Sequence, residues 1–356
     1  MSTCDGDFRS SVNVFPAVSF STSSLEEPVK NDAWRRLTAP LFEATVADAR
    51  QHAVLEGGMT AHFLGGSVVG TMWFNAQHFE RDQRLVLSTG LDQYIVQLFL
   101  EGGASVVCGG REVDVRVGDI LVLDLAKTAS TFAPKGGNTV WMMVSHDTLD
   151  RESAGRNLHG AVIRSYDPLA SLLREMLMSL CQHGHFARTD DESSIEGAAV
   201  SLLVGVIIRS RLDPIQSAPV LSMVLRRRIF AYVEEHLTNP QLGVEHFVVH
   251  FKVSRAHLYR IFSEEGGVAS MIRDRRLDAA YRDLTRGGEH PAGSITETAH
   301  KYFFSSSNHF LRAFRARFCC SPSEAIHVGM GVRVKCSASG ILEHLTGVVA
   351  SMDLSS

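Results

Sequence analysis

Two nine-residue segments near the C-terminal end of the chain carry side chains that can form hydrogen bonds with nucleobases. The segments are SRAHLYRIF at 254–262 and SSNHFLRAF at 306–314, and they start 52 residues apart. Each has an arginine at its seventh position, Arg260 and Arg312. A guanidinium group can bind the O6 and N7 atoms of guanine through two hydrogen bonds, or bind a phosphate. A single arginine would favour a solvated helix face, whereas a matched pair in a repeat favours contact with DNA.

Further side chains that could contact DNA share the outward faces predicted for these two segments. They are Arg255, Ala256, Tyr259, Asn308, His309 and Leu311. The amide of Asn308 suits adenine, while Ala256 and Tyr259 could meet a thymine methyl group. A second set, interpreted as contacts to backbone phosphates, consists of Arg315, Arg317 and Lys301.

Capping patterns and an apolar stripe predict the helices that hold these side chains. Ser294 and Glu297 form an S-x-x-E capping box, and the serines at 305–307 supply an N-cap for the next helix. In that next helix, phenylalanines at 310, 314 and 318 recur every four residues and form a buried stripe. A helix, a tight turn and a second helix with basic groups outward is the layout of a helix-turn-helix.

The segment between the two copies reads as one long connecting helix, MIRDRRLDAAYRDL at 271–284. A helix of this length spans about 20 Å. With the diameters of the flanking helices added, that length is compatible with two major-groove segments one turn of DNA apart, about 34 Å. The repeat therefore predicts two units that bind one face of the duplex.

The N-terminal half changes to a pattern of β-structure after a helix predicted at 31–49. Short apolar runs separated by Gly, Asp, Asn or Pro follow, and they are TMWFNAQHFE, LVLST, DQYIVQLFLEG, ASVVC, REVDVRV, DILVLDL and TVWMMVSH. Many short strands with such turns indicate a small barrel or jelly roll. Four side chains on these strands could contact a small molecule, namely Trp73, Tyr94, Gln97 and Trp141. The alternative is that the aromatic side chains only fill the barrel, because the sequence does not say which face points inward.

Both halves of the chain resemble regulators of the AraC/XylS family. QYIVQLFLEGGASV and GREVDVRVGDILVLDL resemble the cupin-like ligand-binding domain of these proteins, over roughly residues 30–150. EEG, IRDRRLDAAYRDL and TETAHKYFFSSSNHFLRAFRARF, followed by SPSEA, resemble their DNA-binding domain over residues 222–327. The resemblance implies an α+β two-domain fold, with an N-terminal cupin-like β-barrel and flanking helices and a C-terminal all-α double helix-turn-helix.

The predicted domain organisation follows from these segments and from the breaks between them. It comprises a flexible N-terminus at 1–30, an effector-binding and dimerisation domain at 31–212, a linker at 213–221, the DNA-binding domain at 222–327 and a C-terminal tail at 328–356. Two helices are expected after the barrel, and the second, from Ser193, is apolar on nearly every side. In the family such helices commonly form the dimer contact, and a helix sandwiched within its own domain is the alternative. The tail is expected to form a short helix packed on the DNA-binding domain.

Three positions depart from the pattern of the family. The glycine usual at the end of the first helix of each unit is Lys252 in one copy and Phe303 in the other, and the glycine usual before the final Ser-Pro is Cys319. The first two positions often need a left-handed backbone, which costs a residue with a Cβ roughly 1–2 kcal/mol. The second unit is therefore predicted to be the less regular, and the first to supply much of the specific binding.

Composition argues against several other classes of protein. The chain has a net charge of −4, but residues 221–330 hold 15 basic and 11 acidic side chains, which suits a nucleic-acid-binding module joined to an acidic one. The six cysteines lack metal-binding spacing, and no H-x-H pattern occurs within 30–150, so no metal and no cofactor are expected. Cys319-Cys320 is either a redox sensor or a small buried pair. Without a signal peptide or a membrane-spanning stretch, a cytoplasmic protein is expected.

The function predicted from the sequence is that of a sequence-specific, DNA-binding transcription regulator. We expect an effector-responsive activator that acts as a homodimer on double-stranded promoter DNA with RNA polymerase, and that neither contacts a membrane nor catalyses a reaction. The alternatives are an effector-independent repressor or DNA-binding protein, and a cupin-type enzyme. The sequence does not name the effector, and relatives that respond to small aromatic metabolites offer only an analogy.

Overall fold

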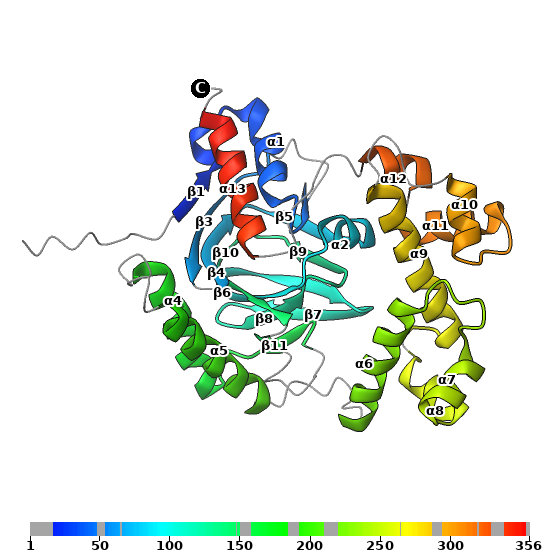
Figure 1. Cartoon of the computed structure of the whole chain (residues 1–356). Helices are drawn as coiled ribbons and strands as arrows, with labels where there is room; N and C mark the ends of the chain where they lie inside the picture. Colours follow the sequence, from blue (N-terminus) through cyan, green and yellow to red (C-terminus); the bar gives the residue numbers. More distant parts are fainter. Residues whose placement is uncertain are drawn as a thin grey trace, which may run out of the picture.

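The chain folds into a sheet domain and a helical domain that lie side by side (Figure 1). The structure, a computed structural model, describes residues 17–47, 54–64, 66–146, 148–149, 158–183, 192–209, 220–263, 265–286, 294–318, 320–328 and 338–353. This arrangement confirms the predicted α+β two-domain fold. Within the described ranges, no helix is both long and apolar enough to cross a membrane.

The sheet domain is built on antiparallel strands that curl into a half-barrel (Figure 1). The strands are β1 (Ala17–Ser21), β2 (Glu43–Val46), β3 (Gly57–Leu64), β4 (Ser67–Phe74), β5 (Gln77–Arg81), β6 (Gln93–Cys108), β7 (Arg111–Arg116), β8 (Ile120–Asp124), β9 (Ala129–Ala133), β10 (Gly137–Ser145) and β11 (Ala161–Ile163). The main path of the sheet runs β1-β3-β4-β10-β6-β9-β5-β2. β6 is the longest strand and pairs with β7, β8, β9 and β10, so it joins the two sides of the half-barrel.

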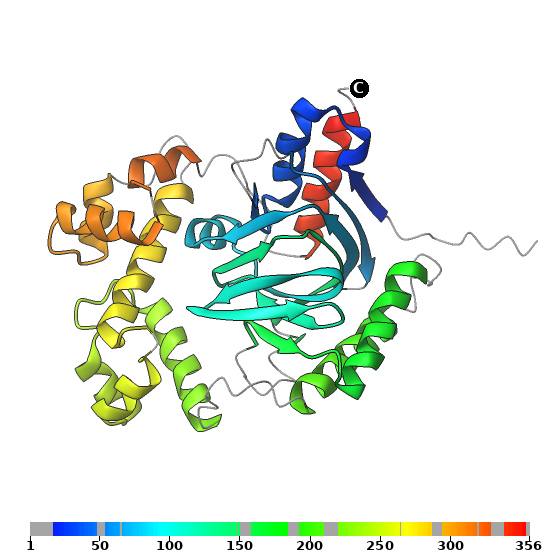
Figure 2. The same cartoon turned by 180° about the vertical axis from the view of Figure 1, so that it is seen from behind.

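Five α-helices belong to the sheet domain, within the described residues. They are α1 (Glu27–Thr38), α2 (Gln83–Thr89), α4 (Pro168–His183), α5 (Glu192–Arg209) and α13 (Ala338–Asp353). The hollow of the half-barrel is filled by one apolar cluster, to which α1 and α13 contribute. A second apolar cluster joins the outer face of the sheet to α4 and α5, which lie together along that face in the view from behind (Figure 2).

The helical domain consists of two three-helix units, with one long helix between them that connects the two. Its helices are α6 (Val220–Glu235), α7 (Val244–Phe251), α8 (Arg255–Ile261), α9 (Val268–Arg286), α10 (Ile295–Lys301), α11 (Ser307–Phe318) and α12 (Pro322–Val328). A single apolar core runs through both units. The predicted stripe of Phe310, Phe314 and Phe318 is buried in this core, where Tyr281 of α9 packs against the last two rings.

The structure corrects several predictions for the N-terminal half. Residues 17–30 are not a loose segment, because β1 pairs with β3 and α1 begins at Glu27. The helix predicted at 31–49 ends at Thr38, since Pro40 interrupts it, and residues 43–46 form β2 instead. The run LVLST is not a strand but most of α2, between an Asp82 N-cap and a left-handed Gly90.

The C-terminal tail also differs from its prediction. We expected a short helix packed on the DNA-binding domain, but α13 packs on the half-barrel, next to α1 and β1 (Figure 1). Its residues Ile341, Leu345 and Val348 are buried in the core of the half-barrel. The position of the linker predicted at 213–221 stays a prediction, because 210–219 lie outside the described residues and α6 begins at Val220. Residues 1–16 and Cys319 also lie outside them.

Candidate nucleic-acid interface

The first helix-turn-helix consists of α7, a three-residue turn and α8. Ser254 caps α8, because its side chain accepts a hydrogen bond from the backbone N–H of His257 at 3.2 Å. Leu258 and Phe262 turn inward and are completely buried. The opposite face of α8 is exposed and carries Arg255, Ala256, Tyr259 and Arg260. The apolar residues thus fix which side of α8 faces solvent.

The second unit repeats this geometry with α10 and α11. The predicted capping box of α10 is present, since Ser294 and Glu297 exchange hydrogen bonds. Ser306 accepts a hydrogen bond from the N–H of His309 at 3.2 Å, just as Ser254 does in the first unit. With the phenylalanines of α11 turned inward, its exposed face carries Asn308, His309, Leu311, Arg312 and Arg315. These nine residues, all predicted to contact DNA, are therefore exposed on the two helices.

The turns of both units contain a left-handed residue that is not glycine. Lys252 has φ 53° and Phe303 has φ 58°, and these are the only non-glycine residues with positive φ among the described residues. The left-handed backbone expected at both departures from the family pattern is thus present. Such a conformation is strained for a residue with a Cβ. At Phe303 a cation–π contact offsets part of that strain, because the guanidinium of Arg276 lies 5.2 Å from the centre of the ring.

Contacts within the exposed faces orient two of the candidate side chains. The Nη2 atom of Arg260 lies 2.8 Å from Nδ1 of His257, one turn earlier on α8. Arg255 forms an exposed ion pair with Glu245 of α7 at 2.6 Å. Exposed ion pairs of this kind stabilise little and are easily exchanged for a phosphate. Both guanidinium groups can therefore turn toward a bound duplex at small cost.

The structure turns Arg317 away from the outward face predicted for it and gives both Arg317 and the exposed Lys301 acidic partners on α9. Arg317 donates to Asp278 from Nε at 2.6 Å and from Nη2 at 2.9 Å, and it also pairs with Asp274. Only 22% of its side chain is exposed, so it locks α11 onto α9. Lys301 pairs with Asp283 of α9. Sequence reasoning missed these acidic partners on α9, although their spacing of four and five residues along the helix could have suggested them.

A contact between the two domains was also not predicted from the sequence. α2 packs against α9 and α11, and Leu87 joins the apolar core of the helical domain. Nε2 of Gln83 lies 3.4 Å from Oδ1 of Asp278, the residue that holds Arg317. Both views show α2 projecting from the half-barrel toward α9 (Figures 1 and 2). The contact leaves the exposed faces of α8 and α11 open.

One buried arginine joins α2 to the half-barrel. Arg81 donates to the carbonyl oxygens of Leu125, Pro40 and Leu41 and to Oγ1 of Thr89, which lies in α2. Burial is the main cause that lowers the pKa of Arg81 to about 10, and nearby carboxylates oppose it. The side chain is completely buried, so these bonds hold α2 at a fixed place on the half-barrel.

The four residues predicted to contact an effector do not share one face of the sheet. Gln97 and Trp141 are directly opposite each other on β6 and β10, and both point into the half-barrel. Tyr94 lies three residues from Gln97 and faces the outer cluster instead, where its ring contacts His146. Trp73 also lies on the outer face, is partly exposed and covers Gly58. The contact with an effector stays a prediction for all four.

The described histidine, cysteine, aspartate and glutamate side chains are not grouped as the ligands of a metal ion would be. No group of three or more His, Cys, Asp or Glu side chains is placed to hold a metal ion in the part of the chain that the structure describes. Burial raises the pKa of Cys108 to about 11 and that of Cys181 to about 12, which leaves both thiols protonated and poorly reactive. Burial also raises the pKa of Cys320, an effect that Arg84 of α2 opposes.

Comparison with known families divides the chain where the structure does. A family model described as an AraC-binding-like domain matches residues 34–207, which cover most of the half-barrel and both helices α4 and α5. A second, described as a helix-turn-helix domain, matches residues 248–327 and contains both α8 and α11. α13 lies beyond the end of both matches.

Individual relatives are distant. The chain is 23% identical over 242 residues to the Msm operon regulatory protein of Streptococcus mutans serotype c, which covers 65% of this chain and 84% of that protein. Among solved structures, the AraC-like transcriptional activator CuxR is 21% identical, with 75% of this chain and 96% of that chain covered and a TM-score of 0.49. ToxT from Vibrio cholerae is 12% identical, with 73% and 97% covered and a TM-score of 0.43.

Proposed function

Because the chain belongs to the AraC family of DNA-binding transcription regulators, we propose that it reads promoter DNA in a sequence-specific way through α8 and α11. The observation that carries this proposal is the pair of exposed arginines Arg260 and Arg312, which occupy equivalent positions on the two helices. Each stands near the second turn of its helix, opposite a buried apolar face. Arginine at such a position can bind guanine in the major groove.

Each of the two units presents some side chains to base edges and others to the DNA backbone. Ala256, Tyr259 and Arg260 on α8, and Asn308 and Arg312 on α11, are the side chains proposed to meet base edges. Arg255, His309 and Arg315 lie on the same exposed faces and serve backbone contacts. α9 has 19 residues and is therefore about 28 Å long. This length supports the binding of two major-groove segments about 34 Å apart.

An effector would act through the half-barrel. Trp141 and Gln97 lie side by side on its inner face, and Arg81 ties that region to α2, which contacts α9 and α11. A small molecule that shifts Leu41 or Leu125 would therefore disturb the acceptors that hold Arg81 and, through it, α2. A change of this kind biases how the two helix-turn-helix units are held.

The assembly proposed is a homodimer in the cytoplasm that recruits RNA polymerase to a promoter and so activates transcription. The helices α4 and α5 support the dimer, because they pack on the sheet with one side and leave a second side to solvent. The exposed side includes Leu172 on α4, with Gly197, Ala198 and Ser201 on α5. The proposed function includes no catalysis.

A gel-shift assay on the upstream regions of neighbouring genes tests the DNA contacts. Arg260→Ala and Arg312→Ala should each weaken specific binding about 5- to 150-fold, the range for loss of one arginine–guanine contact. Arg174→Ala, which removes the same charge from α4, is the matched control and should leave binding unchanged. If neither recognition-helix variant weakens specific binding, the assignment of the contacts is wrong.

A further inference from the structure

One side chain of the connecting helix contacts both helix-turn-helix units. Arg276 stands near the middle of α9, which runs from one unit to the other (Figure 1). Its Nε atom donates to the carbonyl oxygen of Leu237 at 3.0 Å, and its Nη2 atom donates to that of Asn239 at 2.8 Å. Both carbonyls belong to the loop between α6 and α7, in the first unit. The same guanidinium lies 5.2 Å from the centre of the Phe303 ring, in the turn of the second unit.

The loop that receives Arg276 is itself firmly attached to the helical domain. Leu237 and Leu242 are buried in its apolar core, each with an exposed fraction of 7%. Within the loop, the N–H of Asn239 donates to the carbonyl oxygen of His236 at 2.9 Å. The two bonds from Arg276 are partly buried, where a lost hydrogen bond is costly. A planar guanidinium can serve two such acceptors in a fixed geometry, so Arg276 is held in place by the first unit.

The turn of the second unit holds its aromatic ring by means of a strained backbone. Phe303 has φ 58°, in the left-handed region that favours glycine. The turn is closed by hydrogen bonds from the N–H of Phe303 to the carbonyl oxygen of His300, at 3.0 Å, and from the next N–H to that of Ala299, at 3.0 Å. Glycine would form this turn without strain. The strained backbone therefore provides the one thing that glycine lacks, a ring that lies against Arg276.

The corresponding turn of the first unit separates the backbone from the ring. Lys252 adopts φ 53° there, and its side chain is exposed. A lysine has no ring that could lie against a guanidinium, and its positive charge would repel one. The left-handed turn is thus common to both units, whereas the aromatic contact with α9 belongs to the second unit.

The ion pairs of α9 attach each unit to the connecting helix. Arg275 and Arg282 pair with Glu234 of α6 at 3.2 and 3.3 Å. On the other side, Asp283 pairs with Lys301 of α10 at 2.6 Å. These pairs hold α6 and α10 on α9 but leave the loop of one unit and the turn of the other to be related by Arg276. Its contacts therefore bear on the angle between the two units.

We propose that the contact between Arg276 and Phe303 sets the spacing between the two DNA segments that α8 and α11 read. The inference rests on the proposed function, because it concerns how Arg260 and Arg312 act together. A shift of one base pair moves a segment by about 3.4 Å along the duplex and turns it by about 36° around the axis. Units held at a fixed angle meet one spacing without strain, whereas units released from each other accommodate neighbouring spacings at less cost. Arg276 and Phe303 are thus positioning residues.

Selection of DNA from a random library measures the spacing directly. The full chain and each variant select binders from duplexes with about 40 random base pairs, which is long enough for two segments one turn apart. The unaltered protein should enrich two sequence blocks at a single spacing. Arg276→Gln and Phe303→Leu should enrich the same two blocks at spacings that spread by about one base pair in either direction. Phe303→Tyr keeps an aromatic ring at the same place and is the matched control, with the single spacing retained.

A gel-shift assay expresses the same property as a ratio. The duplex selected by the unaltered protein is compared with a version that has an inserted base pair between the two blocks. The loss of affinity caused by the insertion should be about 2- to 5-fold smaller in Phe303→Leu than in the unaltered protein, the range for one cation–π contact. Both duplexes are bound by the same variant, so a general loss of folded protein cancels from the ratio. Phe303→Leu also keeps the test decisive if Arg276→Gln does not fold.

Several outcomes would overturn the proposal. A single, unchanged spacing in both Arg276→Gln and Phe303→Leu would show that their contact does not set it. An equal spread in Phe303→Tyr would remove the role of the aromatic ring. If Arg276→Gln lowers the slope of log affinity against log salt by about 1, Arg276 contacts a phosphate and is not a positioning residue. Failure of the proposed function looks different, because the unaltered protein would then enrich no sequence block, and the inference would fail with it.

Discussion

Replacement of Lys252 by glycine should stabilise the helical domain. Lys252 holds a left-handed backbone with φ 53° and ψ 46° at the end of α7, and its side chain is exposed. Relief of the clash at its Cβ is worth roughly 1–2 kcal/mol. Glycine also gives the unfolded chain more freedom, which costs about 0.5–1 kcal/mol. The expected net gain in the free energy of unfolding is therefore about 0.5–1 kcal/mol.

Phe303 has the same left-handed backbone conformation, but its replacement by glycine should not stabilise the helical domain. Its ring is only 45% exposed and lies against the guanidinium of Arg276. Phe303→Gly relieves the same strain but loses this cation–π contact, about 0.5–1 kcal/mol, together with the buried part of the ring. The two contributions cancel or leave a net loss. The contrast between the positions separates the strain in the backbone from the contacts of the side chain.

Urea unfolding followed by far-UV circular dichroism measures these changes. The three tryptophans, Trp34, Trp73 and Trp141, all lie in the sheet domain, so their fluorescence follows that domain separately from the helices. With a slope of about 2 kcal/mol per molar urea, Lys252→Gly should raise the midpoint of the helical transition by about 0.3–0.5 M. Lys252→Ala keeps a Cβ and is the matched control, with no such gain expected. If alanine raises the midpoint as much as glycine does, the strain argument is refuted.

Three further predictions follow from single contacts. Burial lowers the pKa of His159 to about 4, so between pH 6.5 and 4 the unfolded chain binds a proton that the folded chain does not. Acid should therefore remove about 3 kcal/mol of stability over this pH range. The same acid titration of the His159→Gln variant should lack this loss. Asp278→Asn leaves Arg317 without its main carboxylate and should cost about 3 kcal/mol in helical-domain unfolding. Arg260→Ala should reduce specific DNA binding more than Arg312→Ala in the same gel-shift assay, and a larger loss at Arg312 would reverse the predicted ranking of the units.

The tautomer of His159 gives the pH prediction its physical basis. Nδ1 of the ring lies 3.1 Å from the backbone N–H of Asp124 and must accept, while Nε2 lies 3.0 Å from the carbonyl oxygen of Thr128 and must donate. Both ring nitrogens are thus satisfied only when the ring is neutral. A second proton on Nδ1 would face a donor in a buried site, so acid favours the unfolded chain.

The recognition helices could be predicted because their sequence is repeated. Each copy places a serine cap, an inward apolar stripe and an outward arginine at the same spacing, and these local signals agree with the final packing. Even the left-handed turns could be located at Lys252 and Phe303, since the family pattern has glycine there. The exposed faces of α8 and α11 follow directly from the buried residues between them.

Elements fixed by distant contacts could not be predicted in this way. The run at 85–89 is β-branched and apolar enough to resemble a strand, and only its packing on α9 and the Asp82 and Gly90 caps make it helical. α13 is amphipathic, but nothing in its sequence says which domain receives its apolar side. The face of each strand was also undetermined, and for this reason Tyr94 was grouped with Gln97 although it lies on the opposite side of the sheet.

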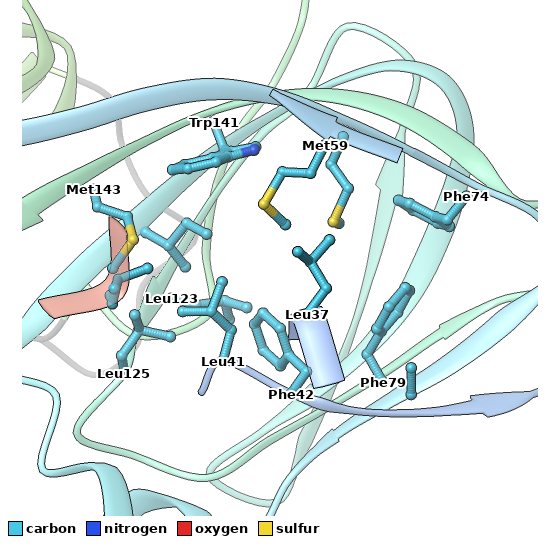
Figure 3. Packing of buried hydrophobic residues seen from close by; sticks show 14 of the residues in the cluster. Leu37, Leu41, Phe42, Met59, Phe74, Phe79, Leu123, Leu125, Trp141 and Met143 are labelled. Atoms are coloured by element: carbon cyan, nitrogen blue, oxygen red, sulfur yellow. The ribbon is translucent and has the colours of Figure 1, made fainter. Parts of the chain in front are cut away.

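These missed elements are the ones that connect the two domains. α2 meets the second helix-turn-helix unit through Gln83 and Leu87, while its position depends on Arg81 and on carbonyl oxygens from the inner side of the half-barrel. α13 carries the end of the helical domain back to the same hollow. Both connections therefore converge on the core around Leu41 and Leu125, which face the side chains of Trp141 and Met143 (Figure 3). A change in how that core is filled would therefore bear on both connections between the half-barrel and the helical domain.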